Sequence, residues 1–144
     1  MAELLAAAAQ IPIAQLTPDL SAPSTRYIRA IVTLIWPYSS SNSTLTVLLA
    51  EPDFRLRRTR GQVRVQFSGS SARNVFEARI GSGDEVILSL DGVEWTKDES
   101  AGHTPGRSID WELRFSERLV LKVLITSTLD HLYHYFDVIL DPAK

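Results

Sequence analysis

The sequence predicts an all-β fold, a five-stranded Greek-key barrel with one short helix between its third and fourth strands. Two observations lead to this prediction. Short segments rich in β-branched and aromatic residues recur along the chain, separated by clusters of glycine, proline and serine. The internal segment with helical character lies between the third and the fourth of these segments.

The composition is that of an ordinary globular domain, and it excludes some kinds of site. The chain has 144 residues, of which 44% are hydrophobic and 22% are charged. It contains no cysteine, which excludes disulfides, thiolate metal ligands and a cysteine nucleophile. No apolar run approaches the ~20 residues of a membrane-spanning helix. We therefore expect a soluble, intracellular protein without a membrane partner.

Residues 1–25 are expected to form a lead-in to the barrel. Glu3–Ala9 has the composition of a short helix, and the prolines that follow block regular structure. The first strand is predicted over Arg26–Trp36, which is rich in β-branched and aromatic residues and ends at Pro37. Because Trp36 ends an apolar strand, we expect it in the core.

The second and third strands flank a basic segment. The second is predicted over Thr44–Glu51, and the basic segment Arg55–Arg60 follows it. The third, Gln62–Phe67, alternates strictly, so its valines and phenylalanine are expected to face the core. Its outward residues are then Gln62, Arg64 and Gln66.

The helix is predicted over Ser71–Ile80, and the fourth strand over Glu85–Leu90, continuing to Val93–Trp95. A long polar loop, Thr96–Ser108, leads to a fifth strand over Asp110–Phe115 that resumes at Arg118–Ile125. Ser116-Glu117 between these two halves is expected to be a bulge or bend. This order, β-β-β-α-β-β over residues 26–125, is that of the OB fold. Another small β-barrel or sandwich is the alternative.

Residues 126–144 follow the complete pattern. Apolar residues from Leu129 to Ile139 fit a helical stripe, while Tyr133–Ile139 also fits a strand. We expect this tail to pack on the barrel through its apolar face, the alternative being an exposed tail.

Three segments resemble the protection-of-telomeres type of OB domain. They are Leu48-Leu49-Ala50-Glu51-Pro52-Asp53, Gly83-Asp84-Glu85-Val86-Ile87-Leu88 and Arg118-Leu119-Val120-Leu121-Lys122-Val123. The resemblance covers about Arg26 to Val123. The chain departs from it at Ala30, where glycine is frequent, and at Glu51, where aspartate is commoner.

The resemblance implies a function as well as a fold. It implies binding of single-stranded, G-rich telomeric DNA, a role in chromosome-end protection, and a nuclear location at the telomeric region of the chromosome. Because some related OB domains hold partner proteins, the alternative is a protein-interaction module within a telomere complex that does not itself bind nucleic acid.

The charge distribution independently indicates an anionic partner. Between Phe54 and Ile80 there are seven arginines and one acid, a net charge of +6, so the remaining residues together carry −8. Arginine suits phosphate contacts and base stacking better than lysine does. The alternative is a solvated arginine-rich loop.

On an OB barrel, ligands bind the face of strands two and three and the loops beside it. Binding of single strands combines a positive groove with aromatic platforms. Gln62 and Gln66 are candidates to contact base edges, and Tyr38 and Phe54 to stack on bases, although Phe54 would also suit the barrel interior. The arginines expected to contact phosphates or bases are Arg57, Arg58, Arg60, Arg64 and Arg107, with Lys97 and Arg114 as an extension. Trp95 and Trp111 are placed next to the long loop, and Trp111 is expected in the core.

The sequence carries no recognisable catalytic site. His131 and His134 share a helix face if the tail is helical, yet a zinc site needs two further ligands. Gly81-Ser82-Gly83 lacks the lysine of a phosphate-binding loop, and there is no Gly-x-Ser-x-Gly elbow. We therefore expect a non-enzyme without a metal, a cofactor or a small-molecule substrate.

Overall fold

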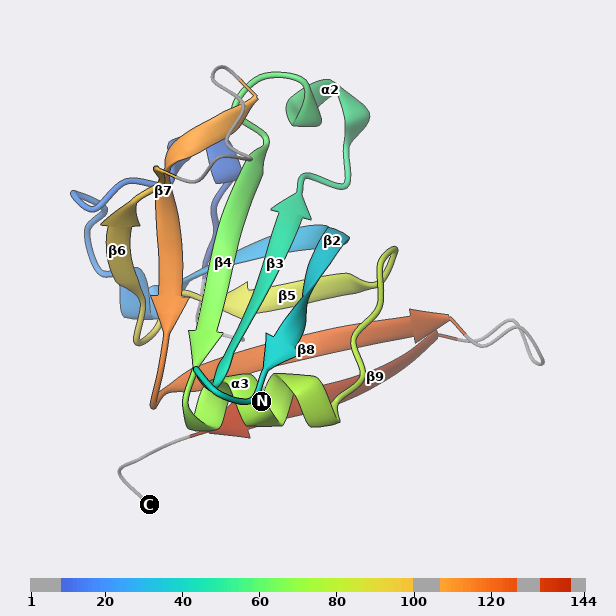
Figure 1. Cartoon of the computed structure of the whole chain (residues 1–144). Coiled ribbons are helices and arrows are strands. Elements are labelled where there is room, and N and C mark those ends of the chain that lie inside the picture. Colours follow the sequence, from blue (N-terminus) through green and yellow to red (C-terminus); the bar gives the residue numbers. More distant parts are fainter. Residues whose placement is uncertain (1–8, 100–106, 127–132, 141–144) are drawn as a thin grey trace.

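The computed structural model describes residues 9–99, 107–126 and 133–140 (Figure 1). Within these ranges the protein is mostly β-sheet with few helices, an OB-like all-β fold. The helical elements are η1 (Ile13–Gln15), η2 (Pro23–Thr25), α2 (Phe54–Arg57) and α3 (Ser70–Glu77). The strands are β1 (Ala9–Gln10), β2 (Arg26–Ser39), β3 (Thr44–Ala50), β4 (Gln62–Ser68), β5 (Glu85–Ser89), β6 (Glu94–Lys97), β7 (Ser108–Phe115), β8 (Leu119–Thr126) and β9 (Tyr133–Leu140). None of the described helices has the length and hydropathy needed to cross a membrane.

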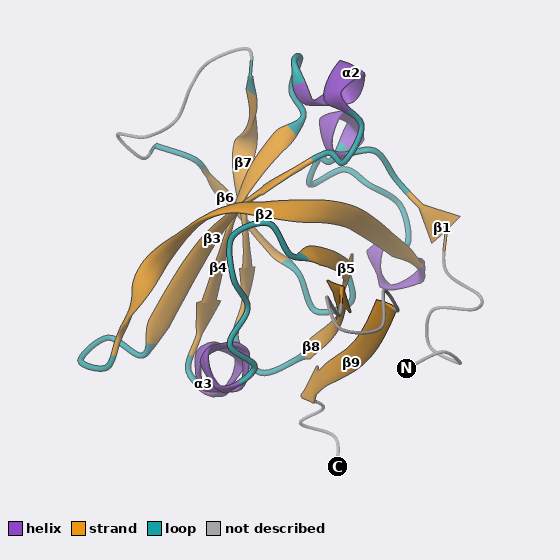
Figure 2. Cartoon of the chain, turned by 90° about the vertical axis from the view of Figure 1, so that its right-hand side faces the viewer, coloured by secondary structure: helices purple, strands orange, loops and turns teal. Residues whose placement is uncertain are grey.

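The described strands form one sheet whose hydrogen-bonded order is β6-β7-β4-β3-β2-β5-β8-β9, with β1 parallel to β2. The long β2 is antiparallel to both β3 and β5. β4 pairs in parallel with β7, whereas β5 pairs antiparallel with β8. β7 and β8 follow each other directly, separated only by residues 116–118, where a bend was predicted. Figures 1 and 2 show β5 and β8 running across the direction of β3 and β4, with α3 at one end of β3 and β4 and α2 at the other.

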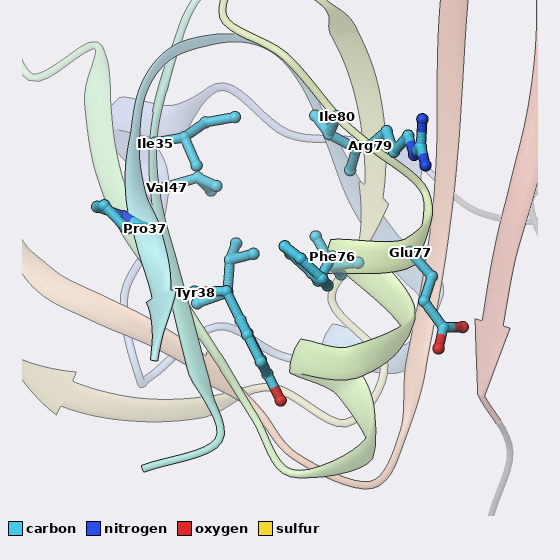
Figure 3. A pocket seen from close by; sticks show the side chains of 10 residues that line it. Ile35, Pro37, Tyr38, Val47, Phe76, Glu77, Arg79 and Ile80 are labelled. Carbon is cyan, nitrogen blue, oxygen red and sulfur yellow. The ribbon is translucent and has the colours of Figure 1, made fainter. Parts of the chain in front are cut away.

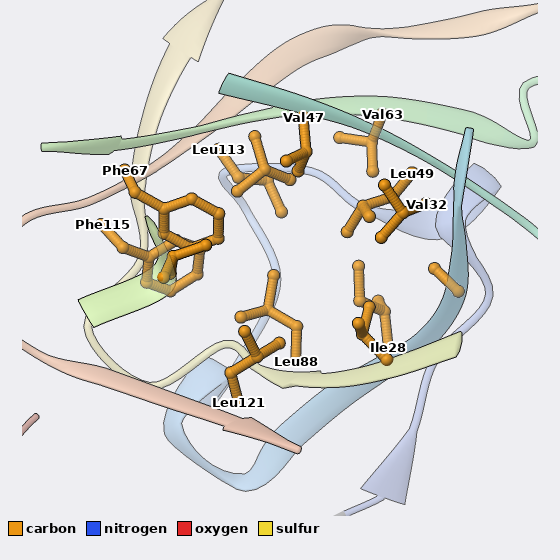
Figure 4. Close-up of a cluster of buried hydrophobic side chains, with 14 of the residues drawn as sticks. Ile28, Val32, Val47, Leu49, Val63, Phe67, Leu88, Leu113, Phe115 and Leu121 are labelled. Atoms are coloured by element: carbon orange, nitrogen blue, oxygen red, sulfur yellow. The ribbon is translucent and has the colours of Figure 1, made fainter. Parts of the chain in front are cut away.

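The core lies between these two sets of strands (Figure 4). The predicted alternation of β4 is confirmed, since Val63, Val65 and Phe67 are buried while the residues between them are half-exposed. The rings of Phe67 and Phe115 stack with their centroids 6.0 Å apart. The helix predicted between β4 and β5 is also present, as α3, and it buries Ala72 and Val75.

A β-bulge in β2 changes which face its residues occupy. The pairing of β2 with β3 shifts between Val32 and Leu34 and again between Trp36 and Ser39. Ile28 and Val32 are buried, but beyond the first bulge the side chain of Ile35 packs on the core and that of Trp36 does not. The expectation that Trp36 lies in the core is therefore wrong, because one extra residue inverts the alternation. The second shift accommodates Pro37, which cannot donate to the ladder, so the strand runs past the predicted end.

Two further elements differ from the prediction. The segment expected to continue the fourth strand instead forms β6, which is antiparallel to β7. Gly92, with φ of +87°, reverses the chain before β6 in a conformation that other residues rarely adopt. At the start of the basic segment, Phe54–Arg57 forms the short helix α2. Asp53 caps this helix, and its side chain accepts from the Arg55 N–H at 2.9 Å.

The flanking segments both add strands to the sheet. The lead-in forms β1, and its buried Ile11, Ile13 and Leu16 join the core. Apart from Ala9, the helix expected over Glu3–Ala9 lies outside the described residues. In the tail the strand alternative is confirmed and the helical stripe is wrong, because β9 pairs along the whole of β8, from Leu119 opposite Leu140 to Thr126 opposite Tyr133.

Candidate nucleic-acid interface

A basic pocket lies at the α2 end of β4. Gly61 lets the chain enter β4 directly beneath α2, because a Cβ at this position would collide with the backbone of Leu56 and Arg57. Arg57 is held in place by two contacts. Its Nε donates to the carbonyl oxygen of Glu51 at 2.9 Å, and its guanidinium lies 4.5 Å from the centroid of the Phe54 ring.

This pocket has a volume of about 330 Å³ and brings together five of the nine predicted site residues. Its lining consists of Phe54, Arg57, Arg58, Gln62 and Arg107. Three cations, an amide and an aromatic ring converge there, and none of the described residues that line the pocket carries a carboxylate. The Phe54 side chain is 70% exposed, so it does not lie in the core. Such a set of groups suits a phosphate together with a stacked base.

The outer face of β4 continues from this pocket. Arg64 points outward between the buried Val63 and Val65, and its guanidinium lies 4.2 Å from the centroid of the Trp36 ring. In the sheet Arg64 lies beside Leu48 of β3 and Glu112 of β7, and Gln66 lies beside Thr46 and Arg114. The face is therefore mixed, with one carboxylate next to Arg64.

Most arginines of this surface keep their charge available. Among the described residues, no carboxylate forms an ion pair with Arg57, Arg58, Arg64 or Arg107. Arg60 differs, because its Nη1 lies 3.6 Å from the Asp110 carboxylate. Arg114, a suggested extension of the groove, is likewise paired, with its Nη2 3.2 Å from Glu112.

Other predicted residues lie elsewhere. Tyr38 is at the α3 end of the strands, where its ring stacks on Phe76 with centroids 4.8 Å apart. Its ring is thus already occupied within the protein. Arg73 and Arg79, which contribute to the basic stretch of sequence, belong to α3 and the residues after it. The structure therefore divides that stretch between two ends of the molecule.

Glu51 is a buried acid beneath this surface that the sequence did not single out as a site residue. Its side chain is 4% exposed and accepts weakly from the Ile13 N–H at 3.5 Å. Burial, with a smaller contribution from nearby Asp53, raises the pKa of Glu51, while the Ile13 hydrogen bond opposes this rise. Glu51 therefore connects two segments. Its carboxylate accepts from Ile13 of the lead-in, and its backbone carbonyl accepts from Arg57 of the basic pocket.

The described residues hold no group of three or more histidine, cysteine or acidic side chains arranged to bind a metal. His103 and His131 lie outside the described residues, as does the side chain of His134, so the histidine pair considered from the sequence is not located.

Fold and surface together define an all-β protein of OB-like architecture with an arginine-rich, aromatic-bearing outer face. The chain belongs to the family described as a domain of unknown function (DUF8502), whose model matches residues 6–131. No curated protein matches the sequence.

Two solved structures are similar to the chain. One is Schizosaccharomyces pombe Pot1pC bound to the single-stranded DNA CGGTTACGGT, with 16% identity and a TM-score of 0.49 over 90% of this chain and 86% of that one. The other is fission yeast Pot1 with single-stranded DNA, with 15% identity and a TM-score of 0.48 over 94% of this chain and 41% of that one.

Proposed function

We propose that this chain binds single-stranded DNA along a track that starts in the α2 pocket and follows the outer face of β4 to Arg64 and Trp36. The observation that carries the proposal is the convergence of Phe54, Arg57, Arg58, Gln62 and Arg107 on one pocket of about 330 Å³. Arginines unpaired with described carboxylates attract the phosphates, and the exposed Phe54 ring offers a platform to a base. Gln62 and Gln66 contact base edges.

We further propose that β7 and β8 act as two halves of one strand that closes a five-stranded barrel. β7 pairs with β4, β8 pairs with β5, and three residues connect them. A closed barrel fixes the curvature of the β4 face, and so fixes the spacing of its arginines along a bound DNA single strand. In this proposal residues 26–125 form the barrel domain, and residues 1–25 and 126–144 flank it.

The telomeric part of the proposal depends on the motifs around Glu51, Gly83 and Arg118 that resemble protection-of-telomeres OB domains. From that resemblance we propose a G-rich telomeric single strand as ligand, a nuclear location at chromosome ends and a contribution to end protection, without enzymatic activity. Other telomere proteins are proposed as further partners.

Fluorescence anisotropy with a labelled G-rich 12-nucleotide single strand tests the proposal, with the same sequence as a duplex for comparison. We expect the single strand to bind more tightly, with an affinity that falls as salt rises. Three phosphate contacts correspond to a log–log slope of about −2 for single strands. Absence of binding at low salt, or a preference for the duplex, contradicts the proposal.

A further inference from the structure

Part of β2 has an open edge. β2 pairs with β3 as far as Ser39, but with β5 only over Tyr27–Ile31. The turn before β5 covers the next two residues: the Val32 N–H donates to the Asp84 carbonyl at 2.9 Å, and the Ser82 hydroxyl donates to the Thr33 carbonyl at 2.9 Å. From residue 34 to residue 39, no described strand lies on this side of β2.

An apolar groove of about 570 Å³ separates this open edge from α3 (Figure 3). One wall comes from β2 and the other from α3 and the residues after it, and the two walls meet where the Tyr38 ring stacks on Phe76. Figure 3 shows the charged ends of Glu77 and Arg79 pointing away from the cavity. The side chains left to face it are Ile35, Pro37, Tyr38, Leu45, Val47, Val75, Phe76 and Ile80. The interior of the groove is therefore uncharged and mostly apolar.

The groove is accessible from solvent. Phe76 on its α3 wall is 54% exposed. Large apolar side chains exposed next to an apolar cavity mark a surface suited to a partner rather than to water.

We propose that this groove docks an extended, uncharged segment of a partner protein, which adds to the open edge of β2 as a further strand. Two features point to a polypeptide. The edge presents backbone N–H and C=O groups that another extended backbone satisfies, and the groove receives alternate apolar side chains. A nucleic acid strand is disfavoured because the one described cation that lines the groove, Arg79, points its guanidinium away from the cavity (Figure 3). Pro37 offers no N–H, so pairing concentrates on the residues on either side of it.

The proposal is independent of the DNA-binding proposal. The groove lies at the α3 end of β3 and β4 and the basic pocket at the α2 end (Figure 1), so both sites can be occupied together.

NMR titration of the ¹⁵N-labelled 144-residue chain with a capped nine-residue peptide of alternating valine and threonine tests this inference. A second peptide, with proline at every other position, retains apolar character but cannot form a strand ladder. We expect saturable shifts of the amides of residues 34–39 and 70–80 with the first peptide and none with the second. Equal binding of the two peptides, no binding of the first, or shifts centred on α2 and β4 overturn the proposal.

Two variants sharpen the test. Phe76→Ala truncates an exposed wall residue, and we expect about tenfold weaker peptide binding. Ile35→Trp fills the groove and should abolish the shifts. The matched control, Phe54→Ala, removes an exposed phenylalanine at the other end and should leave peptide affinity unchanged. Peptide affinity that is insensitive to Phe76→Ala, or dimerisation of the free chain that Ile35→Trp abolishes, contradicts docking of a partner peptide.

Discussion

The guanidinium of Arg64 lies 4.2 Å from the ring centroid of Trp36. The two residues come from strands that are separated by β3, so the contact crosses the middle of the outer face. This cation–π contact uses none of the guanidinium N–H groups as hydrogen-bond donors, so they remain available to an anion. This contact links a cation on the outer face of β4 to an aromatic ring of β2.

Arg64→Ala should weaken binding of the G-rich single strand by about 1–3 kcal/mol, because it removes both a cation and a stacking partner. Arg64→Lys should recover only part of the affinity, since an ammonium lacks the planar fork. Anisotropy titrations at one salt concentration measure both. Arg73→Ala is the matched control, because it removes the same charge from exposed α3. Equal losses for Arg64→Ala and Arg73→Ala would show that binding depends only on net charge.

Phe54→Ala separates stacking from folding. Since the side chain is 70% exposed, we expect the free energy of unfolding to change by less than about 0.5 kcal/mol. DNA affinity should fall by about 1–3 kcal/mol through loss of the platform. Urea unfolding and DNA titration of the same preparation give the two numbers. A loss of several kcal/mol in stability would place Phe54 in the core instead.

Asp110→Asn should free Arg60, whose Nη1 lies 3.6 Å from the Asp110 carboxylate. An exposed pair of this kind contributes at most about 1 kcal/mol, so stability should hardly change. We expect slightly tighter DNA binding and a steeper salt slope, because one more cation becomes available. A salt slope identical to that of the wild type would mean that Arg60 lies outside the DNA track.

Glu51 makes stability depend on pH. Burial raises the pKa of Glu51 above its ordinary value of 4.5, so the folded state holds this proton more tightly than the unfolded state. The free energy of unfolding should therefore fall as pH rises from 4.5 through the raised pKa, and remain lower above it. In Glu51→Gln this decline should be absent while the Ile13 hydrogen bond is retained. Urea-unfolding midpoints across this range, compared with those of the exposed Glu77→Gln, measure the difference.

Gly61→Ala tests whether α2 is held against the start of β4. The added Cβ would collide with the backbone of Leu56 and Arg57, which cannot yield as a flexible side chain does. We expect a loss of about 1–3 kcal/mol in stability and weaker DNA binding, since the pocket residues of α2 are displaced. Thermal unfolding and anisotropy measure the two effects. Unchanged stability would contradict the close approach of α2 to β4.

Local patterns predicted much of this fold. The alternation in β4 placed Arg64 on the outer face, and Ser116-Glu117 marked the break between β7 and β8. The partner of β6 was not predictable locally, since pairing of Glu94–Lys97 with β7 depends on a distant strand. Trp36 was misplaced because the bulge after Val32 has no sequence signature. Asp53, an N-cap residue, was the available signal for α2.

Part of the basic pocket was predictable from local sequence, because most of its residues are close together in the chain. Residues close in sequence to α2 and β4 converge, and Arg107 joins them because β7 pairs with β4. Tyr38 and Arg60 did not join, since each found a partner within the protein. Whether such a side chain contacts another part of the protein or remains available to a ligand depends on distances in the folded structure, which the sequence does not show.

Amide hydrogen exchange of the whole chain, with and without a saturating G-rich single strand, locates the DNA-binding surface. We expect slower exchange on DNA binding over residues 54–66 and around Arg107, with β9 and α3 unaffected. Protection confined to residues 70–80, or no protection anywhere, would contradict this expectation.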